Sequence, residues 1–368
     1  MKERFTRRQF IVRAGVAVAA VQIFQDLDPC CVLAADAPTA HEELFELKPV
    51  ADGVYAAIAA PRYKVNSNAA VILTNDGVVV VDSHSKPSAA LALYRQIQAI
   101  TRQPIRAIVN THFHWDHWQG NHAYVERFPD IEIIASRRTL ENLTRPDAGA
   151  GGIPYVEKQL TTVAKEIEQL RKEASRTTDA TKKARLQSNL LQAQDYLEEL
   201  RQFKPALPTR TVADTLSLNA GGREIELMVL GRAHTDGDLF IYLPKEKVVA
   251  TGDALIDWMP YLNDGYPQDW VRTLDALEAF DFARIIPGHG DVAPREHLAF
   301  FRGYLSDLGA AVKQAAAEGA ALEEMKHVLA DRLAPKYEQA MSKYPMGQYR
   351  ERIGLNIEMM YRKLVGGG

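Results

Sequence analysis

Cysteine is almost absent from this sequence. Only two cysteines occur among 368 residues, and both lie near the N-terminus, as Cys30 and Cys31. If that segment is removed on export, the mature chain has no thiol. This would exclude disulfides, and it would exclude thiolate ligands from any metal site.

Long blocks of one charge are also missing. The net charge is −3 and no long basic stretch occurs, so nucleic acid is not expected as a partner. The apolar run Ala14–Phe24 is too short for a stable membrane anchor. With 46% hydrophobic and 25% charged residues, the chain has the composition of a soluble globular protein, long enough for one large domain with additions or for two domains.

The first 37 residues have the features of a twin-arginine export signal. The segment Thr6–Val12 contains an arginine pair and is followed by the weakly apolar run. Small residues at Ala34, Ala35 and Ala37 predict cleavage nearby. We therefore expect passage through the twin-arginine machinery and a periplasmic or secreted location. The alternative is the frayed basic N-terminus of a cytoplasmic protein.

Strands and helices follow in mixed order from about Leu44. The runs Ala69–Thr74 and Val78–Val81 flank Asn75-Asp76-Gly77, which predicts a β-hairpin, and Ser88–Ile100 has helical composition. The other predicted strands are Ile105–Val109, Ile131–Ala135, Glu224–Leu230, Leu239–Leu243, Lys247–Ala250 and Ala283–Ile286.

Residues 151–205 have a different pattern. Leucines and other apolar residues recur there at alternating spacings of three and four, in two stretches separated by Arg176–Asp179. This predicts two helices packed as an antiparallel hairpin, and a scaffold insertion is favoured over a docking arm. The chain is again helical beyond Arg295. We expect a signal at 1–37, a domain at 38–295 with this insertion, and a helical extension at 296–368.

Histidine is sparse along the chain, yet four histidines lie within Thr111–His122. A single histidine in a loop is usually solvated or bonded to backbone. Three imidazoles and a carboxylate at nearly adjacent positions are different, because together they form the ligand set of Zn²⁺ or a related transition metal. The residues concerned are His112, His114, Asp116 and His117.

Potential ligands also follow three predicted strands further along the chain. His234, Asp253 and His289 each lie just past an apolar strand, beside glycine or another small residue. Ile105–Val109 leads into the histidine cluster in the same way. Four strand ends that deliver ligands to one edge of a sheet indicate a site built on a rigid scaffold.

The H-x-H-x-D-H motif at residues 112–117, followed by these three ligands in order, resembles the metallo-β-lactamase superfamily over roughly residues 45–295, apart from the insertion. The resemblance implies an α+β fold, the αββα sandwich, in which two sheets lie between helices and metals bind at one edge. It implies a first metal on His112, His114 and His234, a second on Asp116, His117 and His289, Asp253 bridging both, and Asp82 bracing the histidine loop.

Two ions about 3.5–4 Å apart share a water and lower its pKa toward 7. The expected function is therefore a dizinc hydrolase, whose metal-bound hydroxide cleaves an ester, thioester, lactone or β-lactam bond of a small molecule. Asp116 is expected to orient or relay the proton, with pure coordination as the alternative. Trp258 and Tyr261 are candidates for the substrate cleft, and His84 is assigned either to the mouth of the site or to the surface.

Other branches of the superfamily leave alternatives open. The lack of thiols in the mature chain excludes β-lactamases with a cysteine ligand, and Gly252-Asp253 resembles the thioesterase and lactonase branches. One alternative is a persulfide oxygenase with a single Fe²⁺, and another is an accessory protein that binds metal without turnover. We expect the insertion and the C-terminal helices to shape the edge of the cleft. The substrate and the oligomeric state stay open.

Overall fold

The computed structural model describes residues 44–60, 64–65, 67–147, 149, 151–343 and 348–366. The expected export signal and both cysteines lie outside the described residues. Within the described part of the chain, no helix combines the length and the apolar character needed to cross a membrane.

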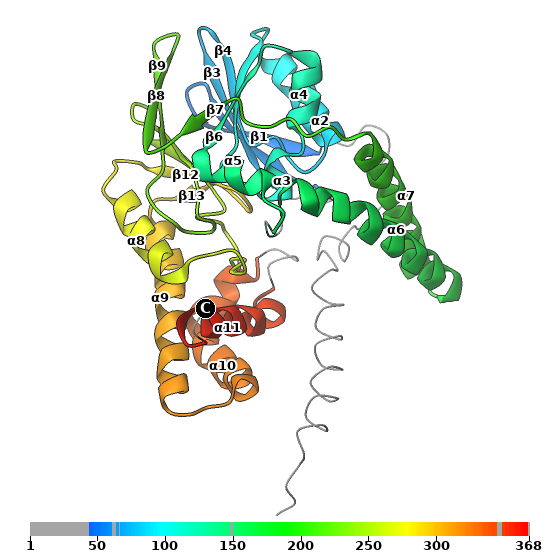
Figure 1. Cartoon of the computed structure of the whole chain (residues 1–368), viewed down its shortest axis with the longest axis vertical. Coiled ribbons are helices and arrows are strands. Elements are labelled where there is room, and N and C mark those ends of the chain that lie inside the picture. Colours follow the sequence, from blue (N-terminus) through cyan, green and yellow to red (C-terminus); the bar gives the residue numbers. More distant parts are fainter. Residues whose placement is uncertain are drawn as a thin grey trace, which may run out of the picture.

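A seven-stranded sheet forms the first half of the fold (Figure 1). Strands β1 to β4 pair antiparallel and β4 to β7 pair in parallel. Valine, isoleucine and alanine fill its central strands, which suits strands covered on both faces. In chain order the strands are β1 (Phe45–Ala51), β2 (Val54–Ala59), β3 (Ala69–Thr74), β4 (Gly77–Val81), β5 (Ile105–Val109), β6 (Glu132–Ser136) and β7 (Arg210–Val212).

A six-stranded sheet, in the order β13-β12-β11-β10-β9-β8, packs against the first. Only β11 and β12 pair in parallel. Ile72 and Val79 of the first sheet share one hydrophobic cluster with Leu227 and Ile241 of the second, so the two inner faces form a common core. The strands are β8 (Thr215–Ala220), β9 (Arg223–Met228), β10 (Phe240–Leu243), β11 (Val248–Gly252), β12 (Arg284–Pro287) and β13 (Ala293–Pro294).

Helices cover the outer face of each sheet. The first sheet is covered by α2 (Pro87–Ile100) and α4 (Asn121–Arg127), and the second by α8 (Pro267–Glu278) and α9 (Glu296–Ala317). The predicted α+β class and αββα sandwich are therefore confirmed. Two short helices, α3 (Trp115–Trp118) and α5 (Arg137–Thr144), lie near the edge where the two sheets end.

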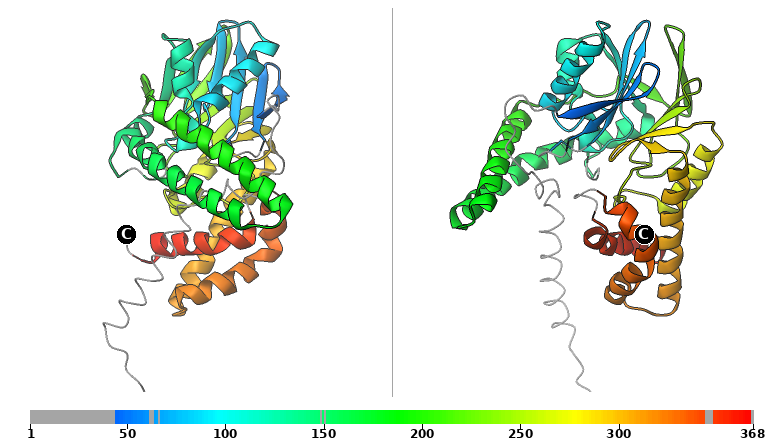
Figure 2. Two further views of the ribbon diagram at one scale, coloured as in Figure 1. Left: turned by 90° about the vertical axis from the view of Figure 1, so that its right-hand side faces the viewer. Right: turned by 180° about the vertical axis from the view of Figure 1, so that it is seen from behind.

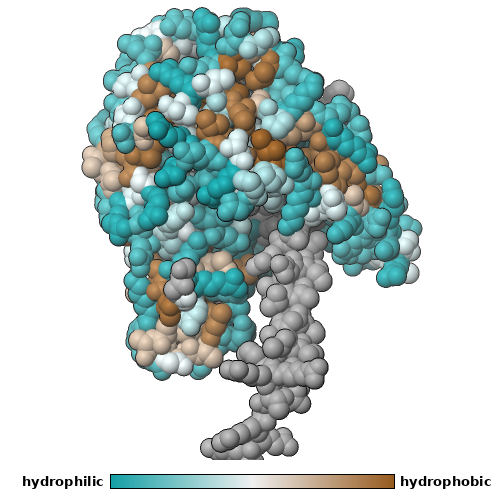
Figure 3. All heavy atoms as spheres, viewed as in Figure 1, coloured by the Kyte–Doolittle hydropathy of each residue, from teal (hydrophilic) through white to brown (hydrophobic). Residues whose placement is uncertain are grey.

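The predicted helical insertion is a hairpin of α6 (Ile153–Arg176) and α7 (Ala180–Gln202). Asp179 caps α7, because its side chain accepts a hydrogen bond from the Lys182 amide. The hairpin extends away from the sheets as an arm (Figure 2). Apolar residues are interspersed with hydrophilic ones on the surface, and several of them lie along this arm (Figure 3).

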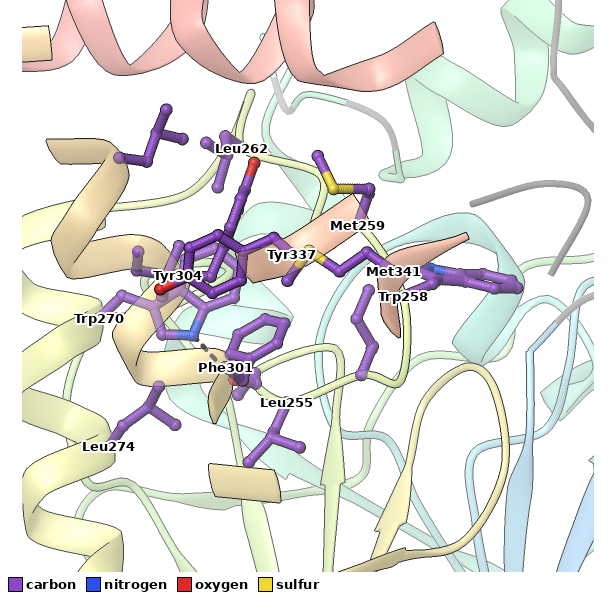
Figure 4. Close-up of a cluster of buried hydrophobic side chains, with 14 of the residues drawn as sticks. Leu255, Trp258, Met259, Leu262, Trp270, Leu274, Phe301, Tyr304, Tyr337 and Met341 are labelled. Carbon is purple, nitrogen blue, oxygen red and sulfur yellow. Dashed lines mark hydrogen bonds between the residues drawn. The ribbon is translucent and has the colours of Figure 1, made fainter. Parts of the chain in front are cut away.

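The helical C-terminal extension continues from α9 into α10 (Leu322–Met341) and α11 (Tyr349–Leu364). It shares one large hydrophobic cluster with α8 and with the loop that follows β11. Figure 4 shows Trp258, Met259 and Leu262 of that loop packed against side chains of α9 and α10. The Trp270 indole donates a hydrogen bond to the Ala254 carbonyl at 2.8 Å, which ties α8 to the same loop.

Candidate metal centre

All seven predicted ligands meet at one edge of the sandwich, where four strands deliver them. The loop after β5 carries four of them, and the segments after β9, β11 and β12 carry one each. They form two groups of buried side chains, and within each group the ligand atoms lie within 4.8 Å of one another. The groups are His112, His114, His234 and Asp253, and Asp116, His117 and His289.

In the first group the imidazoles face one another at close range. His234 Nε2 lies 2.8 Å from His114 Nδ1. The ring of His112 is centred 4.7 Å from that of His114 and 4.8 Å from that of His234. Together with Asp253 of the same group, these three imidazoles provide four ligands of the kind that a tetrahedral metal ion takes.

In the second group a carboxylate lies between two imidazoles. Asp116 Oδ2 is 3.7 Å from His117 Nε2 and 3.4 Å from His289 Nε2. Asp253 joins the two groups, because its Oδ1 lies 3.4 Å from His117 Nε2 and its Oδ2 lies 3.5 Å from His234 Nε2. This is the arrangement that a carboxylate shared by two ions requires.

Several of these atoms lack any other partner. His112 Nε2, His117 Nε2 and Asp253 Oδ1 are buried and have no hydrogen-bond partner among the described residues. Buried polar atoms without a partner cost free energy, so each of them calls for an explanation. A cation provides one, and the combination of imidazole nitrogen with carboxylate oxygen suits Zn²⁺ and related transition metals. The residues thus fit a pair of metal ions.

The pKa values of the ligand histidines depend on burial and on the carboxylates around them. Burial lowers the pKa of His234 to about 3. Burial would also lower the pKa of His117, but the surrounding carboxylates, foremost Asp116 and Asp253, outweigh it and raise that pKa to about 10. Without metal, the His117 imidazole is therefore protonated, and a metal ion must displace a proton to bind it.

Asp82 braces the histidine loop at the end of β4. Its Oδ2 lies 2.8 Å from His117 Nδ1 and accepts a hydrogen bond from the Thr111 hydroxyl at 2.8 Å, while its Oδ1 accepts from the Thr111 amide at 2.8 Å. A carboxylate facing Nδ1 keeps the proton there, so Nε2 is left to face the metal position. These contacts connect the end of β4 to the loop that carries His117.

Asp264 is a functional candidate that the sequence did not reveal. Its Oδ2 lies 2.9 Å from Nε2 of His114, whose Nδ1 faces the first group. Asp264 therefore faces the outer ring nitrogen of His114, as Asp82 faces the outer ring nitrogen of His117. It lies in the loop between β11 and α8, 150 residues from its partner, and no local motif marks it.

The two predicted cleft residues lie beside the metal ligands. The Trp258 ring stacks on that of His289 at 4.8 Å, and the Tyr261 ring is centred 5.7 Å from that of His114. Trp258 is nevertheless 9% exposed and belongs to the core, whereas Tyr261 is 36% exposed. A cavity of about 130 Å³ is lined by Asp257, Trp258, His297, Phe300, Ala340, Met341 and Lys343.

The expectation for His84 was wrong, because this side chain lies neither at a mouth nor on the surface. It is fully buried and stacks on Phe45 with a centroid distance of 4.1 Å. Its Nδ1 lies 3.1 Å from the Ser67 carbonyl, and Ser67 Oγ donates to the Asp116 carbonyl at 2.5 Å. His84 thus packs behind the metal loop.

The family model described as "Metallo-beta-lactamase superfamily" matches residues 62–289. A linear primary-alkylsulfatase of Pseudomonas sp. is 25% identical over 235 residues, which cover 60% of this chain and 41% of the relative. A metallo-beta-lactamase type 2 of Bacteroides fragilis is 29% identical over 96 residues, which cover 24% of this chain and 39% of the relative.

The aligned part thus spans about two fifths of each of these two relatives. Among solved structures, a metallo-beta-lactamase from Pontibacter korlensis is 17% identical with a TM-score of 0.49, and the match covers 71% of this chain and 99% of that one.

Proposed function

From the premise that the chain belongs to the metallo-beta-lactamase superfamily, whose model spans more than half of it, we propose that it is a metal-dependent hydrolase with two zinc ions. One observation carries the proposal: seven buried ligands form two groups, which Asp253 joins through its approach to His117. Nε2 of His112, Nε2 of His117 and Oδ1 of Asp253 have no hydrogen-bond partner in the described part of the chain. A site with one ion would leave part of this set unsatisfied.

Two bound zinc ions would supply a water with a pKa near 7 and a Lewis acid for the substrate oxygen that gains charge. The residues of the chain supply the rest. Asp82 and Asp264 hold protons on the outward-facing nitrogens of His117 and His114, so that the other nitrogen of each ring faces a metal. We assign Asp116 to accept a proton of the attacking water on its carboxylate. Oδ2 of this carboxylate lies 3.4 Å from His289 Nε2.

The proposed substrate is a small molecule with an ester, thioester, lactone or β-lactam bond. Tyr261 would contact it beside His114, and Trp258 would support the wall on the His289 side. Aromatic rings of this kind bind the apolar part of a substrate while the metals act on its polar bond.

A sulfate ester is a second candidate substrate, and one specific observation favours it. The relative named as a linear primary-alkylsulfatase aligns over 235 residues, more than twice the span of the β-lactamase relative. The 130 Å³ cavity beside Trp258 is lined partly by apolar side chains, Phe300, Ala340 and Met341, which would suit an alkyl chain, and partly by Asp257, His297 and Lys343. We propose to assay alkyl sulfates alongside the carboxylic ester-like substrates.

Metal content tests the proposal first. The purified full chain, with no metal added, is expected to contain about two zinc ions per molecule by elemental analysis. A content of about one iron ion per molecule would instead favour the persulfide oxygenase over the hydrolase. Oxygen consumption with a persulfide would then be measured. Two zinc ions without turnover of any ester, thioester, lactone, lactam or sulfate would favour the accessory protein.

We further propose that the chain is exported through the twin-arginine machinery to the periplasm or the medium. The order of the arginine pair, the apolar run and the small residues supports this. Replacing both arginines in the variant Arg7→Lys/Arg8→Lys should retain the protein in the cytoplasm, as fractionation followed by immunoblotting will show. Unchanged export of this variant would argue against the twin-arginine route.

A further inference from the structure

The base of the helical hairpin lies directly against the metal loop, residues 111–119. The hydrophobic cluster that holds α6 and α7 together also contains Phe113 and Trp118 of this loop. Both side chains are buried, and the ring of Trp118 also contacts that of Phe203 at the end of α7, with centroids 5.6 Å apart. The insertion and the ligand-bearing segment therefore share one core.

The backbone of Gly151, just before α6, lies close to the backbone of the metal loop. A Cβ atom at this position would lie 2.1 Å from the Phe113 carbonyl oxygen and 2.5 Å from the Cα of His114. The Gly151 carbonyl also accepts a hydrogen bond from the Trp118 indole at 2.7 Å. The residue before the hairpin is thus in contact with both ends of a segment that contains His114, Asp116 and His117.

Tyr196 of α7 contacts the other end of the metal loop. Its hydroxyl lies 3.1 Å from Oε1 of Gln119, two residues after His117, and it also contacts Oε1 of Gln159 on α6. The amide nitrogens of both glutamines are buried without a partner in the described part of the chain. Turning one amide by 180° lets the hydroxyl donate to one glutamine and accept from the other. One buried phenol then joins both hairpin helices to the loop.

A third contact is made through an ammonium group. Lys64 Nζ lies 5.0 Å from the ring centroid of Trp115 and 5.7 Å from that of Tyr196. Trp115 lies between the ligands His114 and Asp116 in the sequence. A cation between two aromatic rings attracts both, which adds to the attachment of α7 to the loop.

The loop needs such external support. Its only helix, α3, has four residues, and so short a helix is not stable by itself in water. Metal ligands, however, must be held within about 0.5 Å of their working positions. The contacts of Gly151, Tyr196 and Lys64 surround the three ligands His114, Asp116 and His117, and those of Gly151 and Tyr196 come from the insertion.

We propose that the base of the hairpin is a clamp that sets the directions of these three ligands, with Gly151 and Tyr196 as its positioning residues. The inference rests on the metal binding of the proposed function and does not depend on which bond is hydrolysed. The proposal gives the insertion a role in the metal centre, whereas the sequence alone predicts a scaffold insertion.

Cobalt binding tests the clamp in the full chain. The variants are Gly151→Ala, whose new methyl group meets the Phe113 carbonyl, and Tyr196→Phe, which removes only the hydroxyl. Leu186→Ala is the matched control, because Leu186 is buried in the same cluster but lies near the hairpin turn. Affinity for Co²⁺ is measured by competition with a chelator, the visible spectrum reports the ligand geometry, and urea unfolding reports the stability of each variant.

We expect Gly151→Ala and Tyr196→Phe to bind Co²⁺ about tenfold more weakly or worse, with an altered visible spectrum, as losses of outer contacts to metal ligands typically do. Leu186→Ala should lower stability while affinity and spectrum stay unchanged. If Gly151→Ala fails to fold, Tyr196→Phe carries the test.

Wild-type affinity and spectrum in the folded variants would overturn the clamp, and so would an equal change in Leu186→Ala. A wild-type chain that binds no Co²⁺ would instead overturn the proposed function itself, and the clamp with it.

Discussion

At the scale of single residues, the metal centre depends on carboxylates that touch no metal position. His117 is held by Asp82 and His114 by Asp264, in each case through the ring nitrogen that points away from its group. Each carboxylate sets the tautomer and the ring orientation of its histidine, and it makes the ligand nitrogen more basic. The two sides of the centre are therefore oriented by residues from different halves of the chain.

Replacing Asp264 with asparagine should weaken metal binding. In Asp264→Asn the acceptor for the His114 Nε2 proton loses its charge, so we expect affinity for zinc to fall about 10- to 100-fold, together with activity. Chelator competition measures the affinity. Asp281→Asn is the control, because the Asp281 side chain is exposed and pairs with Lys247 on the surface. Unchanged affinity in Asp264→Asn would show that His114 is oriented by other contacts.

His84 should make the stability of the metal-free protein depend on pH. Burial lowers its pKa from 6.5 to about 3, so the neutral ring is favoured in the folded state. The unfolded chain then takes up a proton below pH 6.5 that the folded chain does not. The stabilisation is thus fully present above pH 6.5 and is lost toward pH 3, by about 1.4 kcal/mol per pH unit.

The variant His84→Asn tolerates the positive φ of 69° at this position and removes the titrating ring. Urea unfolding in the presence of a chelator, at several pH values between 4 and 7, should give a shallower slope of stability against pH than in the wild type. Equal slopes in the two proteins would exclude His84 as the source.

At the scale of elements, the loops after the strands are joined to one another across the two sheets. Asn68, just before β3, donates from its side chain to the carbonyls of Pro287 and Gly290, at 3.0 and 2.8 Å. Its side-chain oxygen accepts from the Ala59 amide at 3.1 Å. The loop that carries His289 is thus tied to the first sheet by one buried amide.

Asn68→Ala should destabilise the fold by about 3 kcal/mol, because it leaves two buried carbonyls and one half-buried amide without their partner, at roughly 1–3 kcal/mol for each buried group. Asn219→Ala is the control, since Asn219 lies at an exposed position near the end of β8 and accepts one hydrogen bond from the Gly222 amide. Urea unfolding of both variants measures the difference. Similar, small losses in the two variants would show that water or rearrangement replaces the contacts of Asn68.

At the scale of the whole molecule, the C-terminal extension belongs to the core of the second half. Leu298, Phe301 and Tyr304 of α9 share a cluster with Trp270 and with Trp258, which stacks on the ligand His289. Each such side chain contributes roughly 1.5–3 kcal/mol on burial, and a whole domain is stable by only about 5–15 kcal/mol. We therefore expect the fold around the metal ligands to depend on the extension.

A chain that ends at residue 295 should lack a cooperative unfolding transition and should bind zinc far more weakly than the full chain. Thermal unfolding followed by circular dichroism, with and without zinc, measures both effects. Val328→Ala, at an exposed position of α10, is the control for changes within the extension. Cooperative unfolding of the truncated chain at the wild-type temperature would show that the sandwich folds without these helices.

The sequence by itself determined which elements form and which residues can hold metal. Both depend on local pattern: β-branched runs predicted most central strands, and the motif at residues 112–117 and the strand ends predicted seven ligands that the structure brings together. Only the tertiary structure decided that His84 is buried, that Asp264 reaches His114 across 150 residues, and that Tyr196 touches the metal loop. These contacts depend on how distant segments pack, and side chains brought together only by packing leave no periodic or local signal in the sequence.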